Sequence, residues 1–311
     1  MAEKPALPAR IAPMLCTVSE PFDDVKWHFE VKWDGVRALL FVDAAGAIRI
    51  HNRRCTRIDE RYPDILAAAR ALPPGLVLDG EIIVVAPDGR PDFASVLARE
   101  QGRPGRDLAS LARRHPACFV AFDLLYQDHV PVLDEVFATR RARIEALELG
   151  HDGGALLHAG GVVGEGRRYF AEVAARGLEG IVAKRLDARY HPGKRHDSWR
   201  KIKVTQTRAC VVIGWLESTK SKHDLKSLLV ATDLEDGRGL RYVGKVGSGF
   251  GDEERARLLA RLEGLERAQP ILPCGERGAR FVAPELYVEV RFLEVTPQKR
   301  LRAPVFVRTL A

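Results

Sequence analysis

Alternating apolar and polar residues predict short β-strands through the first two thirds of the chain. Residues 28–42 read as two strands around a tight turn at Asp34-Gly35. Short apolar runs predict four more strands: 76–85, 118–126, 180–185 and 198–204. Helical spacing of apolar residues predicts three helices, 60–72, 139–149 and 167–176, the last capped by Gly177. We therefore expect an α+β domain.

The pattern changes near residue 205. Beyond it, β-like runs recur at 210–215, 226–233, 240–246 and 287–295, with one helix over 253–267. Several strands and one helix in about a hundred residues are compatible with a small five-stranded barrel of the OB type. The chain has 311 residues, enough for two hydrophobic cores. We expect two domains, 1–204 and 205–311.

The composition restricts the class of protein only weakly. The formal net charge of +7 suits a polyanionic partner, and it would also suit an ordinary basic protein. No apolar run is long enough to span a membrane, and no export leader is visible, so we expect a cytoplasmic protein. The five cysteines are scattered without a Cys-x-x-Cys pair, which argues against a structural zinc site.

The most specific signal is the hexapeptide Lys32-Trp33-Asp34-Gly35-Val36-Arg37. A K-x-D-G-x-R pattern should arise by chance only a few times in roughly a thousand chains of this length. The two-residue period of the preceding strand places Glu30 and Lys32 on one face and Phe29, Val31 and Trp33 on the other. A lysine amine attacks phosphorus only when it is unprotonated, so the motif predicts a lysine nucleophile in a shielded site.

A second lysine-rich strand has the same alternation. In residues 199–203, Trp199, Lys201 and Lys203 fall on one face. Two ammonium groups there would favour the neutral form of Lys32 and would bind nucleotide phosphates. The alternative is an edge strand that carries lysines to prevent aggregation.

Two carboxylates and two other side chains are further candidates. Glu81 in Asp79-Gly80-Glu81 and Glu179 before Gly180 are hard oxygen donors of the kind that Mg²⁺ prefers, although each alone reads equally as a solvated glutamate. Taken alone, Phe122 reads as a core aromatic and Arg53 as a surface arginine.

In order along the chain, these residues resemble the motifs of the covalent nucleotidyltransferase superfamily, which comprises ATP-dependent DNA ligases, RNA ligases and mRNA capping enzymes. The resemblance rests on Lys32 to Arg37, Arg53, the Asp79-Gly80-Glu81 segment, Phe122-Asp123, the segment 179–184 and Lys201-Ile202-Lys203. The segments 12–15 and 242–250 are most similar to the ligase module of bacterial end-joining ligases and their stand-alone relatives.

This resemblance implies a nucleotidyltransferase domain of ATP-grasp-like, antiparallel sheets with helices, followed by an OB-fold barrel. It also implies ATP as cofactor with Mg²⁺, for which Mn²⁺ can substitute, and nicked duplex DNA as substrate, in DNA repair or recombination. A Ku-like end-binding protein is a candidate partner. The expected enzyme is a monomer at the bacterial nucleoid.

The resemblance also implies roles for individual residues. Lys32 would carry AMP, Glu81 and Glu179 would hold the metal, and Lys201 and Lys203 would neutralise the α-phosphate. Glu30 and Phe122 would recognise adenine, and three arginines would contact ribose or phosphates: Arg37, Arg53 and Arg195. Lys245, Lys220 and Lys222 would bind DNA phosphates, although the last two read equally as a solvated basic loop.

One departure and three alternatives accompany this reading. The family's last motif continues from an Arg-x-Pro-x-Phe element to an Asp-Lys pair, whereas this chain has 302–306 in that form and no such pair before Ala311. We therefore expect slow loading of Lys32 or a truncated chain. The hexapeptide also occurs in RNA ligases and guanylyltransferases, and the OB domain with its positive charge would suit a non-catalytic nucleic-acid clamp.

Overall fold

The structure is a computed structural model that describes residues 5–102, 108–150, 154–218, 224–234 and 239–310. The chain divides into two compact units, Met1–Lys203 and Val204–Ala311. Among the described residues, no helix is both long and apolar enough to cross a membrane. Each unit has its own hydrophobic core and is treated separately below.

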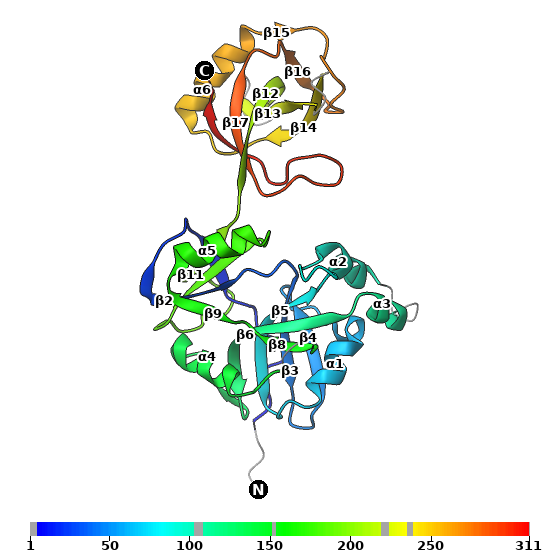
Figure 1. Cartoon of the computed structure of the whole chain (residues 1–311), viewed down its shortest axis with the longest axis vertical. Helices are drawn as coiled ribbons and strands as arrows, with labels where there is room; N and C mark the ends of the chain where they lie inside the picture. The colour runs from blue at the N-terminus through cyan, green and yellow to red at the C-terminus, as the bar shows by residue number, and fades with distance from the viewer. Residues whose placement is uncertain (1–4, 103–107, 151–153, 219–223, 235–238, 311) are drawn as a thin grey trace. The chain divides into compact units, whose positions relative to one another are not determined.

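Two β-sheets form the framework of the first unit (Figure 1). One sheet has the order β1 (Leu15–Val18), β11 (Arg195–Lys203), β10 (Gly180–Arg185), β2 (Asp24–Val31) and β9 (Gly161–Gly164). The other has the order β4 (Ile48–Asn52), β3 (Val36–Val42), β5 (Leu76–Val84), β6 (Ala117–Gln127) and β7 (Val130–Pro131), and β8 (Leu156–His158) pairs with β6. Neighbouring strands are antiparallel except β1 with β11 and β6 with β8. These sheets and the helices around them confirm the predicted α+β nucleotidyltransferase class.

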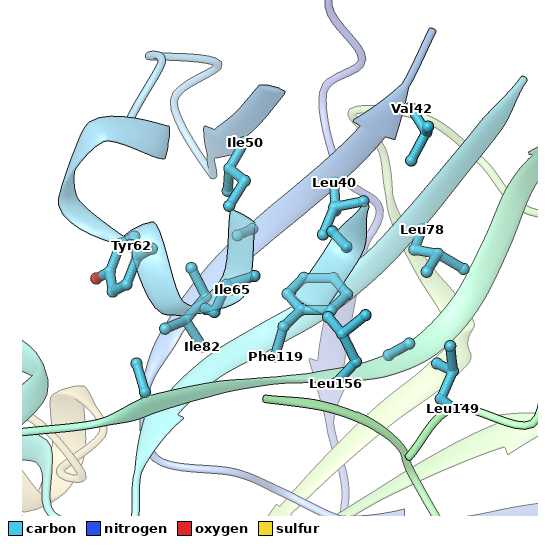
Figure 2. Close-up of a cluster of buried hydrophobic side chains, with 14 of the residues drawn as sticks. Leu40, Val42, Ile50, Tyr62, Ile65, Leu78, Ile82, Phe119, Leu149 and Leu156 are labelled. Atoms are coloured by element: carbon cyan, nitrogen blue, oxygen red, sulfur yellow. The ribbon is translucent and has the colours of Figure 1, made fainter. Parts of the chain in front are cut away.

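The first unit has three apolar layers, one on the outer face of each sheet and one between the sheets. The outer face of the β3–β5–β6 sheet packs against α1 (Pro63–Ala69), α2 (Phe93–Gln101) and α4 (Phe137–Glu145), and Figure 2 shows part of this cluster, including Leu40, Leu78 and Phe119. The outer face of the other sheet packs against α5 (Gly166–Ala175) through Phe29 and Ile181. The third layer lies between the sheets. Strand alternation therefore gives each strand one face toward a helix and one toward the space between the sheets.

The hexapeptide crosses from one sheet to the other. Strand β2 ends at Val31 and β3 begins at Val36, and the two strands belong to different sheets. The two strands were predicted correctly, but they do not pair across the Asp34-Gly35 segment. Gly35 is required at the crossing because a Cβ atom there would lie 2.2 Å from the carbonyl oxygen of Ile82.

The helices were predicted in part. Residues 60–72 were expected to form one helix, but a 3-10 turn at Asp59–Arg61 precedes α1, because Pro63 starts a new helix at its first position. Helix α5 and its cap at Gly177, which has φ +70°, are as predicted. Helices α2 and α3 (Leu108–Arg114) were not predicted.

The described residues of the second unit form a single curled antiparallel sheet with one helix. Its strands are β12 (Gln206–Glu217), β13 (Leu225–Asp233), β14 (Leu240–Val246), β15 (Glu266–Arg267), β16 (Ala279–Val282), β17 (Tyr287–Phe292) and β18 (Val305–Thr309). The long β12 pairs with β13 on one side and with β17 and β16 in succession on the other. Helix α6 (Asp252–Glu263) covers the core through Leu258 and Leu262. This arrangement agrees with the predicted OB-type fold.

Candidate functional site

A polar pocket opens between the two sheets of the first unit. Its lining comes from both sheets and from the segment before β1: Pro13, Met14, Leu15, Cys16, Glu30, Val31, Lys32, Trp33, Arg37, Arg53, Glu81, Phe122, Val182, Lys184, Arg195, Trp199, Lys201 and Lys203. Nine of the ten first-unit residues predicted for the site are in this lining, and the exception is Glu179.

Strand alternation explains which side chains reach the pocket. In β10, Ile181 and Ala183 pack under α5, so Val182 and Lys184 face the other way. In β11 the same alternation presents Trp199, Lys201 and Lys203 together, as predicted. Trp33 was expected to point away from Lys32, but β2 has already ended there and Trp33 also lines the pocket.

Lys32 lies just beyond the end of β2 and forms an ion pair with Glu179. Its Nζ contacts Oε2 of Glu179, and Lys203 Nζ lies 2.8 Å from Oε1 of the same carboxylate. Burial alone would raise the pKa of Glu179, but the two ammonium groups lower it overall. Glu179 therefore stays ionised while it joins two lysines that sequence places 171 residues apart.

Glu81 is the second candidate metal ligand. Its side chain faces the pocket from β5, close enough to Arg37, Lys32 and Glu179 to interact with them electrostatically. Burial is the largest influence on this carboxyl and raises its pKa to about 7, against the opposing effect of the two cations. Glu81 is therefore poised to gain or lose a proton near neutral pH.

Glu30 forms a buried ion pair that the sequence analysis did not identify. Its Oε1 lies 2.7 Å from Nζ of Lys184, and both side chains are almost fully buried. Lys184 also donates a 2.8 Å hydrogen bond to the carbonyl oxygen of Phe122, and its Nζ lies 4.3 Å from the centre of the Phe122 ring. Burial raises the pKa of Glu30 to about 7, and Lys184 opposes the rise. Lys184 lies five residues after Glu179, and this spacing is the sequence feature that could have identified Lys184 as a site residue.

Arg37 is held by protein groups. Its Nε and Nη2 donate hydrogen bonds of 2.5 and 2.6 Å to the fully buried Asp79, and its guanidinium lies 4.5 Å from the centre of the Phe122 ring. The Asp79 carboxylate raises the pKa of Arg37 although burial opposes this. Asp79 was read only as part of a motif, because its role depends on a partner 42 residues away in sequence.

Arg53, Arg195 and Lys245 are solvent-exposed. Arg53 and Arg195 line the mouth of the pocket, and the guanidinium of Arg195 contacts the carbonyl oxygen of Cys16. In the second unit, Lys245 is half exposed and lies 3.0 Å from Oε2 of Glu276. Lys220 and Lys222 lie outside the described residues.

Comparison with known proteins places this arrangement in a family. The sequence model described as ATP dependent DNA ligase domain matches residues 9–203, and the model described as ATP dependent DNA ligase C terminal region matches residues 221–309. The chain belongs to the ATP-dependent DNA ligase family. Both units of this ligase chain are therefore accounted for by the family, in the order that the sequence predicted.

Curated relatives of this ligase chain include longer proteins. It is 34% identical over 310 residues to the multifunctional non-homologous end joining protein LigD of Mycolicibacterium smegmatis, covering 97% of this chain and 38% of that protein. It is 33% identical over 313 residues to the LigD of Pseudomonas aeruginosa, covering 97% of this chain and 36% of that protein. The chain thus spans a little over a third of these relatives.

A solved structure matches the chain over nearly its full length. The ligase domain of Mycobacterium tuberculosis LigD is 34% identical, with a TM-score of 0.57, and the match covers 97% of this chain and 95% of that domain. A mycobacterial DNA ligase D in complex with ATP is 32% identical with the same TM-score and coverage. The likeness thus extends over both units of the chain.

Proposed function

We propose that the chain is a ligase module that seals nicks in duplex DNA through AMP carried on Nζ of Lys32. The observation that carries the proposal is that Lys32, two lysines of β11 and Glu81 line one pocket, with Glu179 in contact with Lys32. In the first step the Lys32 amine bonds to the α-phosphorus of ATP and the bond to pyrophosphate breaks. AMP then passes to the 5′-phosphate of the nick, and the 3′-hydroxyl displaces it.

The lining of the pocket supports distinct roles for its residues. Lys201 and Lys203 face the pocket beside Lys32 and would balance charge on the α-phosphate. Burial and then Lys203 lower the pKa of Lys201, as expected for a cation crowded by another. Phe122 offers its ring to the pocket for adenine stacking, and the buried Glu30 would accept a hydrogen bond from the base.

The three arginines would act at different depths. Arg53 and Arg195 are exposed at the mouth and are suited to phosphates. Arg37 would contact ribose or phosphate with its guanidinium still bound to Asp79, which limits its reach. Its principal proposed task is therefore to support the Phe122 ring.

The carboxylates of the pocket fit a divalent cation. Mg²⁺ usually takes one or two protein carboxylates and completes its coordination with phosphate oxygens and water. Glu81 and Glu179 supply that number of carboxylates, and at Glu179 the cation would take the place of a lysine contact. We propose these two residues as ligands of Mg²⁺, or of Mn²⁺ in its place. The metal would supply positive charge that stabilises the departing phosphate oxygens.

The wider context is proposed from the family and from the second unit. Residues 1–204 would form the adenylation domain and 205–311 the OB-fold domain. Lys245 would bind a DNA phosphate, as would Lys220 and Lys222. Relatives named for non-homologous end joining support a role in DNA repair, and a Ku-like protein is the partner proposed for it. The enzyme would act as a monomer in the bacterial cytoplasm, at the nucleoid.

Labelling with ATP tests the central step. Incubation with α-labelled ATP and Mg²⁺ should give a covalent label on the denatured protein, stable in alkali and released in acid as a lysyl phosphoramidate is, and Lys32→Ala should abolish it. A label that survives Lys32→Ala, or no label on the wild-type protein, would refute the proposal and favour a non-catalytic clamp. Stronger labelling by GTP, or preferential sealing of nicked RNA, would instead favour a guanylyltransferase or an RNA ligase.

A further inference from the structure

The segment of residues 13–16, called the strap here, forms one wall of the nucleotide pocket. Pro13, Met14, Leu15 and Cys16 all line it, although none belongs to the motifs that predicted the site. The backbone N–H of Leu15 donates to the carbonyl oxygen of Lys194, and β1 then runs parallel to β11. The strap is therefore an added edge of the sheet that carries Lys201 and Lys203.

The peptide groups of Met14 are held from both sides by buried side chains. The N–H of Met14 donates a 2.8 Å hydrogen bond to the hydroxyl oxygen of Tyr190, and Nη2 of Arg37 donates to its carbonyl oxygen at 3.4 Å. The Tyr190 hydroxyl in turn donates a 2.6 Å hydrogen bond to Oδ2 of Asp79. Since Asp79 also binds Arg37, the four residues close a ring of hydrogen bonds.

This ring has little freedom to rearrange. Asp79 is fully buried and Tyr190 is 3% exposed, so neither polar group can exchange its partner for water without cost. Burial, followed by the nearby Asp79 carboxylate, raises the pKa of Tyr190 well above its usual value of 10. The hydroxyl therefore keeps its proton and remains a donor to Asp79 at any working pH.

The ring also contacts the aromatic residues of the pocket. Arg37 lies 4.5 Å from the centre of the Phe122 ring and 5.5 Å from that of Trp199. The Tyr190 ring meets the Trp199 ring edge-on, with 5.6 Å between the centroids. One hydroxyl group thus links the strap on one wall to the aromatic platform on the other.

We propose that Tyr190 is a positioning residue that sets the strap against the Phe122 platform and so determines the affinity for ATP. This inference rests on the proposed function, because it assigns a role within the same site. Tyr190 is absent from the pocket lining and acts through Met14 and Arg37. The contacts that it organises lie on the walls of the pocket, not on the Lys32–Glu179 pair. Binding of ATP should therefore weaken while the rate at saturating ATP is kept.

The first test compares Tyr190→Phe with Tyr62→Phe. Tyr62 is a matched control because it is fully buried in the same unit, and its hydroxyl donates a 2.6 Å hydrogen bond to Glu100 away from the pocket. In single-turnover labelling, Tyr190→Phe should raise the half-saturating ATP concentration roughly three- to tenfold, the effect of one lost hydrogen bond. The rate at saturation should stay within about twofold of the wild type.

The control decides between positioning and general destabilisation. Tyr62→Phe should lower the melting temperature and leave the half-saturating ATP concentration unchanged. An equal rise in both variants, or no rise in Tyr190→Phe, would overturn the proposal for Tyr190. Neither result would affect the ligase proposal, which fails if the wild-type protein does not label or if Lys32→Ala still labels.

A second test follows the strap directly by hydrogen exchange, first in the wild-type protein and then in Tyr190→Phe. Hydrogen exchange of a peptide containing Met14 should slow when α,β-methylene-ATP is added, because the bound nucleotide would cover the strap and shield its backbone from solvent. In Tyr190→Phe the same peptide should exchange faster without nucleotide than it does in the wild type. If adding the nucleotide does not change the exchange rate of this peptide in the wild type, the inference is overturned.

Discussion

The ammonium group of Lys203 lies 2.8 Å from Oε1 of Glu179. The other oxygen of that carboxylate contacts Lys32, the proposed nucleophile, so the negative charge is shared between two lysines. In Lys203→Met the whole negative charge would face Lys32, and the pocket would lose a cation that balances charge on the α-phosphate. Labelling at saturating ATP should slow more than about tenfold at pH 7. Lys203→Arg should retain more of the rate.

If Lys203→Met labels at the wild-type rate, Lys203 neither shares Glu179 with Lys32 in a way that matters for labelling nor acts on the α-phosphate.

Metal dependence should change near neutral pH because of Glu81. Its pKa is raised to about 7, and a proton competes with a cation for the same oxygens. Below pH 7 the carboxyl is mostly protonated, so the half-saturating Mg²⁺ concentration for labelling should fall as the pH rises from 6 to 8. Glu81→Gln should label weakly and lose this trend. A half-saturating concentration that is constant across the range would exclude Glu81 as a ligand.

The buried pair of Glu30 and Lys184 should be critical to stability. Lys184→Met leaves the Glu30 carboxyl buried without its cation, at a cost of about 3 to 5 kcal/mol in the free energy of unfolding. Glu30→Gln combined with Lys184→Met should recover part of this loss. Urea unfolding of the wild type, both single variants and the double variant gives the coupling. Additive losses would show that the pair contributes little as a pair.

In the second unit, Glu276 should weaken DNA binding by Lys245. Its carboxylate accepts hydrogen bonds from Lys245 Nζ and from the Tyr242 hydroxyl, each at 3.0 Å, and so occupies the position of a phosphate. Glu276→Gln should tighten binding to nicked duplex several-fold at low salt, by about one additional phosphate contact in the salt dependence. Fluorescence anisotropy against salt concentration measures both quantities.

Glu254→Gln is the matched control for this experiment. Glu254 also pairs with a cation, Arg257, and with a hydroxyl, that of Thr309, but it lies on α6 and binds these groups rather than Lys245. It should leave the salt dependence unchanged. If both variants bind DNA equally more tightly, the gain reflects net charge alone, and the assignment of Lys245 is wrong.

The residues that line the pocket could be predicted from the sequence better than the sheets to which their strands belong. A two-residue period places alternate side chains on one face of a strand, so the grouping of Trp199, Lys201 and Lys203 followed from spacing alone. The period cannot say which sheet a strand joins. For that reason the hexapeptide was read as a turn within one sheet, although β2 and β3 lie in two.

Which buried side chains pair with one another depends on contacts between distant segments, and a local sequence pattern does not show these contacts. Tyr190 and Asp79 are 111 residues apart, and Lys184 and Phe122 are 62 residues apart. Taken alone, each of these side chains is a common surface or core residue. Helix α2 escaped notice for a similar reason, because its interior residue Arg99 is buried by its bonds to Asp64 rather than by an apolar pattern.

Because the hexapeptide passes between the two sheets, the pocket exists only where both are assembled. Lys32 follows a strand of one sheet, and Glu81 and Phe122 belong to strands of the other. A nascent or partly unfolded chain would present Lys32 to solvent without the groups that activate it. Covalent labelling by ATP would thus report on folding, because it would mark only molecules in which both sheets are formed and packed together.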